Sequence, residues 1–140
     1  MGTSKRTGVC LCGTVTVVAA EASNEVGACH CSMCRGWSGG PFVEVDCGTS
    51  VEFSNVDAIT VFNSSDWAER GFCSNCGTHL FYRIKETGQT IVPVGIFPGD
   101  ETLSFERQVF IDQKPHYYSF AEKTEDFTGE QVFAMFGGGD

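Results

Sequence analysis

The chain has 140 residues, of which 41% are hydrophobic and 12% aromatic, which excludes a disordered chain and predicts one globular domain over residues 1–140. Its 18 acidic and 9 basic side chains give a formal net charge of −9, and no basic patch is visible that could bind nucleic acid. The sequence contains neither a run of about 18 apolar residues nor a leader-like start, so we expect no membrane association and a cytoplasmic location.

Several segments rich in β-branched and aromatic residues predict strands. Turn-forming residues separate these segments at the spacing of an antiparallel β protein, and the pattern does not favour a parallel α/β sheet. The predicted strands are residues 14–19, 41–46, 58–62, 78–83, 90–95 and 108–111.

Two short helices are expected. One follows Cys31, and the other covers residues 129–136, where Thr128 and Gln131 are predicted to form a capping box. Residues 137–140 are expected to be a frayed tail. The apolar face predicted to pack the second helix on the sheet consists of Val132, Phe133 and Phe136.

Eight cysteines form three groups, with Cys47 alone. In a reducing compartment thiols more often bind metal or react than pair as disulfides, so the groups predict metal binding. The alternative is a set of four disulfides in an exported protein. The groups are Cys10 with Cys12, then Cys29, Cys31 and Cys34, then Cys73 with Cys76.

The first and last groups predict one closed structural zinc site. Cys73 and Cys76 can reach one ion from a tight turn, and Gly77 permits the positive φ that points backbone amides at the thiolates. Cys10 and Cys12 form a tighter version of this turn. Because structural zinc prefers four ligands, the two pairs together complete a site that ties the first strand to the middle of the chain.

The middle group predicts an open site. Cys29, Cys31 and Cys34 place three thiolates within six residues, and three protein ligands with one vacant position is how catalytic zinc is held. Alternatively, His30, Cys47 or a distant residue completes an inert tetrahedron. His30 lies between two ligands, so its side chain is expected to point elsewhere, and Cys47 is expected to be a small buried hydrophobe. An iron–sulfur cluster fits this division of cysteines less well than zinc.

These motifs resemble the glutathione-dependent formaldehyde-activating enzyme family, also called the centromere protein V domain family, over about residues 8–120. The motifs are GVCLCG at 8–13, CHCSMCR at 29–35, RGFCSNCGT at 70–78 and FIDQKP at 110–115. The resemblance implies an all-β, Mss4-like (β-tent) fold in which two zinc ions hold antiparallel sheets with short helical segments. It places Cys10, Cys12, Cys73 and Cys76 on the structural ion and Cys29, Cys31 and Cys34 on the catalytic ion.

The resemblance also implies a reaction. The named activity of the family is condensation of formaldehyde with glutathione to S-hydroxymethylglutathione, a carbon–sulfur lyase reaction when written in reverse. It implies a small-molecule thiol such as glutathione and a small electrophile such as formaldehyde as substrates. A three-thiolate zinc has formal charge −1 and is a weak Lewis acid, so we expect it to bind the substrate thiolate and not to polarise the aldehyde.

Four further features have both a functional and a structural interpretation. Arg35 and Arg70 are candidate contacts for an anionic thiol, or else solvated surface charges or members of a structural ion pair. His79 would carry a proton or bond a carbonyl, and residues 114–118 would wall a pocket or complete the core.

The sequence leaves two alternatives to an enzyme. The main alternative is a non-catalytic, zinc-stabilised binding module of the same fold. Chromosome or microtubule association, by analogy with the centromere members, is disfavoured by the acidic balance. The sequence specifies neither the thiol nor the oligomeric state.

Overall fold

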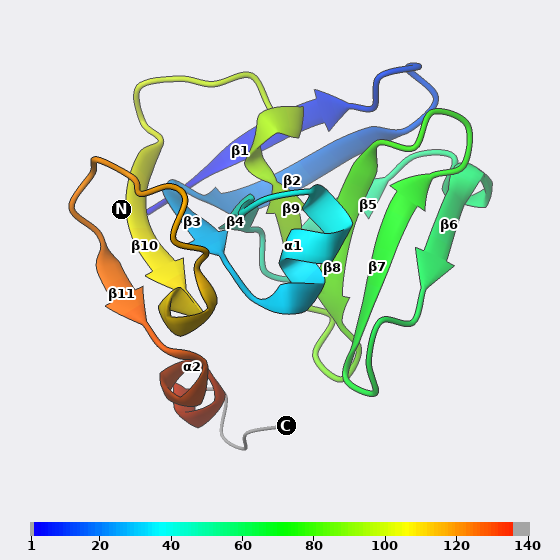
Figure 1. Ribbon diagram of the computed structural model, residues 1–140. Helices are drawn as coiled ribbons and strands as arrows, with labels where there is room; N and C mark the ends of the chain where they lie inside the picture. Colours follow the sequence, from blue (N-terminus) through cyan, green and yellow to red (C-terminus); the bar gives the residue numbers. More distant parts are fainter. Residues whose placement is uncertain (1, 136–140) are drawn as a thin grey trace.

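A computed structural model describes residues 2–135 as a mostly β protein with two sheets (Figure 1). Within these residues neither α-helix is long and apolar enough to cross a bilayer. The strands are β1 (Thr3–Val9), β2 (Thr16–Ser23), β3 (Glu25–Cys29), β4 (Phe42–Asp46), β5 (Val51–Phe53), β6 (Ile59–Phe62), β7 (Ala68–Cys73), β8 (His79–Ile84), β9 (Thr90–Pro93), β10 (Ser104–Val109) and β11 (Glu125–Phe127). The helices are α1 (Ser32–Ser38) and α2 (Gly129–Met135), with short 3-10 turns η1 (Val56–Ala58), η2 (Val94–Ile96) and η3 (Ile111–Gln113).

The smaller sheet has the order β1-β2-β5 and the larger one β11-β10-β3-β4-β9-β8-β7-β6. Neighbouring strands are antiparallel, except that β10 runs parallel to both β3 and β11. The predicted all-β fold with short helices is therefore confirmed, with two parallel pairs added at one side of the larger sheet. These pairs bring residues after 104 beside β3, which leads directly into the second cysteine group.

The main core joins the two sheets. On β2 the alternation of the strand buries Val17 and Ala19 completely, and they pack with Val45 of β4 and Leu80 and Phe81 of β8. The opposite face of β4 carries Phe42, which packs with Cys29 and Cys34 in a second buried cluster. Figure 1 shows α1 following β3 and lying over this face of the larger sheet. The larger sheet thus separates two buried clusters.

The second helix begins where the sequence predicts. The Thr128 N–H donates to Gln131 Oε1 at 2.8 Å and the Gln131 N–H donates to Thr128 Oγ1 at 3.2 Å, which is the expected capping box. Phe133 packs edge-on against Phe110 with ring centroids 5.6 Å apart. Phe136 and the predicted tail at 137–140 lie outside the described residues.

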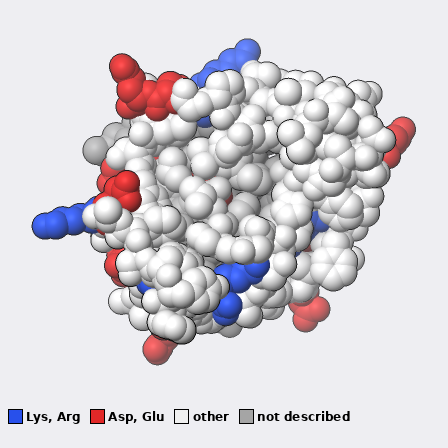
Figure 2. Space-filling view, turned by 45° about the horizontal axis from the view of Figure 1, so that its top comes forward, with Lys and Arg blue, Asp and Glu red and all other residues white. Residues whose placement is uncertain are grey.

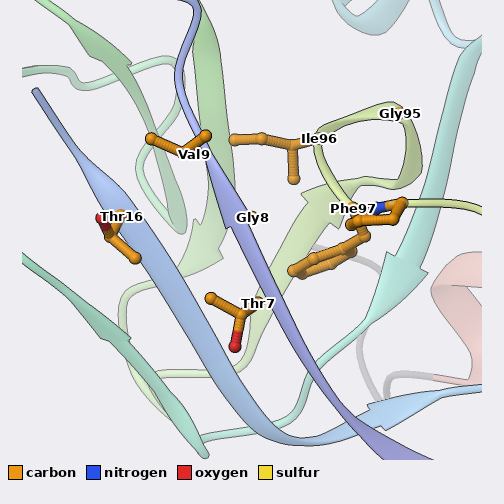
Figure 3. A pocket seen from close by; sticks show the side chains of 8 residues that line it. Thr7, Gly8, Val9, Thr16, Gly95, Ile96 and Phe97 are labelled. Carbon is orange, nitrogen blue, oxygen red and sulfur yellow. The ribbon is translucent and has the colours of Figure 1, made fainter. Parts of the chain in front are cut away.

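A glycine on β1 allows the close approach of η2. Figure 3 shows Gly8 beside Ile96 and Phe97, in a shallow pocket of about 330 Å³. A Cβ atom on Gly8 would lie 2.4 Å from the Ile96 carbonyl oxygen and 3.2 Å from the Phe97 ring. Gly8→Ala is therefore expected to force the backbones apart and to lower the free energy of unfolding by about 2 kcal/mol.

Urea unfolding measures this effect, with Gly95→Ala as the control. Gly95 lines the same pocket, but a Cβ atom there would meet nothing within 4 Å. An equal loss in both variants would show that the pocket, and not the contact at Gly8, causes the destabilisation.

Candidate metal centres

The four cysteines of the first and last groups meet at one point. Cys10 Sγ lies 3.6 Å from Cys12 Sγ and 3.8 Å from Cys73 Sγ, and Cys12 Sγ lies 3.8 Å from Cys73 Sγ. With Cys76 included, all four sulfur atoms are within 4.8 Å of one another. A tetrahedral ion with metal–sulfur bonds of about 2.3 Å requires sulfur–sulfur edges of about 3.8 Å. The cluster therefore has the dimensions that such an ion requires.

Each cysteine pair of this cluster lies in a turn closed by glycine. The Gly13 N–H donates to the Cys10 carbonyl at 3.0 Å, and the Gly77 N–H donates to the Cys73 carbonyl at 2.8 Å. The two glycines have φ of 84° and 81°, a left-handed conformation that favours glycine. The same local geometry therefore presents both pairs of sulfur atoms.

Hydroxyl groups support the thiolates of the four-cysteine cluster. The Thr14 hydroxyl lies 3.1 Å from Cys12 Sγ, and its hydrogen bond lowers the pKa of Cys12 to about 5. The Thr78 hydroxyl lies 3.1 Å from Cys76 Sγ and lowers the pKa of that thiol to about 7. Deprotonated thiols are the form that binds metal, so these hydroxyls prepare the cluster for an ion.

The other three cysteines form a second cluster on the α1 side of the larger sheet. Cys29 ends β3, Cys31 is the N-cap of α1, and Cys34 lies in the first turn of the helix. Their sulfur atoms are within 4.8 Å of one another, and the Cys34 N–H donates to Cys31 Sγ at 3.3 Å. The end of β3 and the start of α1 thus bring all three thiols to one position.

The three thiols differ in pKa. Hydrogen bonds from Cys29 and then Cys34 lower the pKa of Cys31 strongly. The same interaction with Cys31 raises the pKa of Cys29, because a thiol that donates to a thiolate holds its proton.

His30 does not supply a fourth ligand. It is completely buried, and its Nε2 lies 2.8 Å from Gln108 Oε1 while its Nδ1 lies 2.9 Å from the Tyr118 hydroxyl. Because an amide oxygen only accepts, Nε2 carries the proton and Nδ1 accepts from Tyr118. Burial also lowers the pKa of His30, which keeps the ring neutral. Both ring nitrogens are therefore engaged away from the three thiols.

Cys47 lies apart from both clusters. It is completely buried in the main core, and burial raises its pKa to about 12. A lone buried thiol of this kind behaves as a small apolar side chain. Among the described residues, only the three cysteines of the second cluster gather at its position.

The segment after β10 braces the three-cysteine loop from outside. Gln113 Oε1 accepts the Ser32 N–H at 3.0 Å, and Arg35 Nε donates to the His30 carbonyl at 2.9 Å. Lys114 Nζ donates to the Tyr118 carbonyl and lies 4.9 Å from the centre of that ring. Gln113, and Tyr118 through its hydrogen bond to His30, therefore hold the loop in place, and Arg35 lies beside the cluster with its Nε bound to the loop.

Arg70 contacts the cluster directly. Its side chain is buried, and its Nη1 and Nη2 donate to Cys34 Sγ at 3.7 and 3.6 Å. The guanidinium lies between Trp37 and Tyr82, 5.0 and 4.8 Å from their ring centres. His79 stacks on the same indole with centroids 4.1 Å apart, and burial followed by the Arg70 charge lowers its pKa.

Sequence reasoning missed Trp37 and Tyr82. Trp37 lies three residues after Cys34, a spacing that puts both on one face of α1, and this was an available signal. Tyr82 pairs with Ile91 and faces Arg70 across β7 and β8, which only the sheet register reveals.

Glu44 is a third residue that the sequence did not single out. It lies opposite Gly27 on the sheet face that also carries Phe42, and 8% of the residue is exposed. Its Oε1 has no hydrogen-bond partner among residues 2–135. Burial, and then the charge of Asp46, raise the pKa of Glu44 to about 7, against an opposing effect of Arg107.

Figure 2 shows one face of the molecule, on which a hollow near the middle has mostly uncharged surroundings. The pocket in Figure 3 lies between β1 and η2, and a polar pocket of about 460 Å³ lies near Asp46 and Arg107. Neither of these two pockets includes a member of the three-cysteine cluster.

Three comparisons relate the chain to known proteins. A model of the glutathione-dependent formaldehyde-activating enzyme family matches residues 5–113. An uncharacterized lyase of Schizosaccharomyces pombe is 36% identical over 126 residues, which cover 89% of this chain and 92% of that protein. The crystal structure of a Rhodobacter sphaeroides protein has a similar fold, with a TM-score of 0.56 and 24% identity, covering 68% of this chain and 90% of the other.

Proposed function

The chain belongs to the glutathione-dependent formaldehyde-activating enzyme family, and from this premise we propose that it is a zinc-dependent carbon–sulfur lyase acting on a thiol adduct. The observation that carries the proposal is the cluster of Cys29, Cys31 and Cys34, because His30 forms hydrogen bonds elsewhere through both ring nitrogens and Cys47 lies apart in the main core. We assign zinc to both clusters, since four thiolates suit a structural ion and three suit a catalytic one. The free cysteines fit a reducing, cytoplasmic location.

The proposed reaction joins a small thiol such as glutathione to formaldehyde or a related electrophile. The sulfur–carbon bond forms as the carbonyl π bond breaks, and the proton lost from the thiol ends on the new hydroxyl oxygen. Zinc, when bound, would lower the pKa of a thiol that enters its coordination sphere. Cys29, Cys31 and Cys34 would hold that ion, and Arg35 beside the loop is the candidate contact for a substrate carboxylate.

The test compares the wild type with Cys31→Ser. Serine is a good N-cap and can accept the Cys34 N–H, so we expect α1 to form while one of two zinc ions is lost. Zinc content and the exchange rate between formaldehyde, glutathione and their adduct are measured together. We expect acceleration by the wild type and at least a hundredfold loss in the variant.

Cys47→Ser is the matched control, because it makes the same atomic change in a buried cysteine outside both clusters. The Cys47→Ser protein should keep both zinc ions and accelerate the exchange reaction as much as the wild type does. Two tightly held zinc ions in a wild type that gives no acceleration with glutathione or other small thiols would contradict the enzyme and favour the binding module.

A further inference from the structure

The charge around the three-cysteine cluster is set by a residue outside it. Three thiolates and a divalent ion sum to a charge of −1, and a fourth anionic sulfur would make it −2 in a buried place. Cys29 and Cys34 are 9% and 5% exposed, so solvent screens this charge poorly. An anionic ligand would therefore be opposed unless a cation lies nearby.

Arg70 provides that cation. The residue is 3% exposed, and both of its Nη atoms are within 3.7 Å of Cys34 Sγ. With its charge counted, the site with three thiolates and a divalent ion is neutral. A guanidinium does not lose its proton in proteins, so this compensation holds at every relevant pH.

The position of Arg70 is built into the fold. β7 places the residue opposite Tyr82 on β8, and α1 brings Trp37 over it from the other side. His79 backs the indole through a parallel stack. A side chain that lies against two aromatic rings and makes two contacts to one sulfur atom has little freedom to turn toward solvent.

Two other arginines are placed differently. Arg35 binds the loop carbonyl of His30 through Nε, and Arg83 on β8 pairs with Glu69 at 3.1 Å. Arg70 has its contact with a cluster sulfur atom instead.

We propose that Arg70 is a positioning residue that neutralises the three-cysteine site and thereby lets its vacant position accept an anionic thiolate. The inference rests on the proposed function, because it assumes that a thiol binds there. In this role Arg70 acts through Cys34. The sequence had suggested a direct contact with the substrate instead.

The test uses cobalt-substituted protein, whose sulfur-to-metal charge-transfer absorption reports ligand exchange without turnover. We would titrate 2-mercaptoethanol, which has no charge apart from its sulfur, into the wild type, Arg70→Gln and Arg70→Lys. Glutamine keeps an N–H donor but loses the charge, and lysine keeps the charge but loses the planar fork. From Coulomb's law at an effective dielectric constant of about 20, we expect Arg70→Gln to bind the thiol about 10- to 100-fold more weakly.

Arg70→Lys should bind the thiol within about threefold of the wild type, since the charge is retained. Arg83→Gln is the control, because it removes an equal charge from the neighbouring strand, where Arg83 pairs with Glu69 and not with a cysteine. It should leave the thiol affinity unchanged.

The outcomes separate the two proposals. If cobalt in the wild type does not respond to the thiol, the proposed function fails. If the wild type responds and Arg70→Gln responds equally, the role of Arg70 is overturned while the function stands. If Arg70→Gln no longer holds cobalt, the lysine variant decides: weak thiol binding in a cobalt-loaded Arg70→Lys protein overturns the charge explanation, and near-normal binding supports it.

Discussion

Cys73→Ser is expected to lower the thermal midpoint by at least about 15 °C, because a structural ion of this type contributes folding energy directly. Cys73 is completely buried in the main core, and its sulfur lies 3.8 Å from those of Cys10 and Cys12. Without the ion, the turn after β1 and the turn between β7 and β8 lose their common anchor. The remaining thiols would then repel one another wherever they ionise.

Circular dichroism melting curves and zinc content per chain measure this effect. Cys47→Ser, in the same core but outside both clusters, should keep both zinc ions and shift the midpoint by only a few degrees, about the cost of burying one hydroxyl. A Cys73→Ser protein that has lost one ion yet has the same thermal midpoint as the wild type would disprove the folding role of the four-cysteine cluster.

Glu44→Gln is expected to stabilise the protein at pH 8 by about 3 kcal/mol and to have much less effect at pH 4.5. The carboxyl has a pKa near 4.5 when unfolded and about 7 when buried in the fold. Between these values the folded state binds more protons than the unfolded state, so stability falls as pH rises from about 4.5 to 7. Above pH 7 the full cost of the buried charge remains.

The groups around Glu44 explain why its pKa is raised. Asp46 on the same strand adds repulsion, and Arg107 on β10 only partly offsets the loss of water. Glutamine has nearly the same shape and no charge to bury, so the variant removes the pH-dependent cost.

Urea unfolding at the two pH values measures the difference between variant and wild type, so that titration of the cysteine clusters, common to both proteins, cancels. Glu52→Gln, an exposed carboxyl on β5, is the control and should give the same small change at both pH values. A gain from Glu44→Gln that is equal at pH 4.5 and pH 8 would place the benefit in packing and contradict the ionisation argument.

Local composition predicted several of the strands that carry β-branched and aromatic residues, but not β1, β3, β5 or β11. The predicted segments at 41–46, 58–62 and 78–83 correspond to β4, β6 and β8, each within one residue at either end. β7, with the sequence AERGFC, was missed because Glu, Arg and Gly are poor strand formers, and pairing on both sides overrides that preference. β9 ends at Pro93, before the predicted residue 95, because the chain turns into η2 there.

The cysteine grouping was predictable because metal-ligand spacing is local, whereas the surroundings of the second cluster were not. His30 finds Gln108 and Tyr118 only because β10 runs parallel beside β3. Arg70 was noticed in the sequence as a cation, but its contact with Cys34 depends on the pairing of β7 with β8 and on α1 above them. Such contacts between distant segments leave no periodic signal in one sequence.

The parallel pairing of β3 with β10 has a consequence for biosynthesis. Translation releases the three cysteines early, but the residues that brace their loop, Gln108, Gln113 and Tyr118, emerge roughly eighty positions later. The four-cysteine cluster is complete once Cys76 has emerged. A nascent chain should therefore acquire its structural ion first and keep the reactive loop unbraced until synthesis is nearly finished, so that a truncated product ending before β10 would hold only one ion firmly.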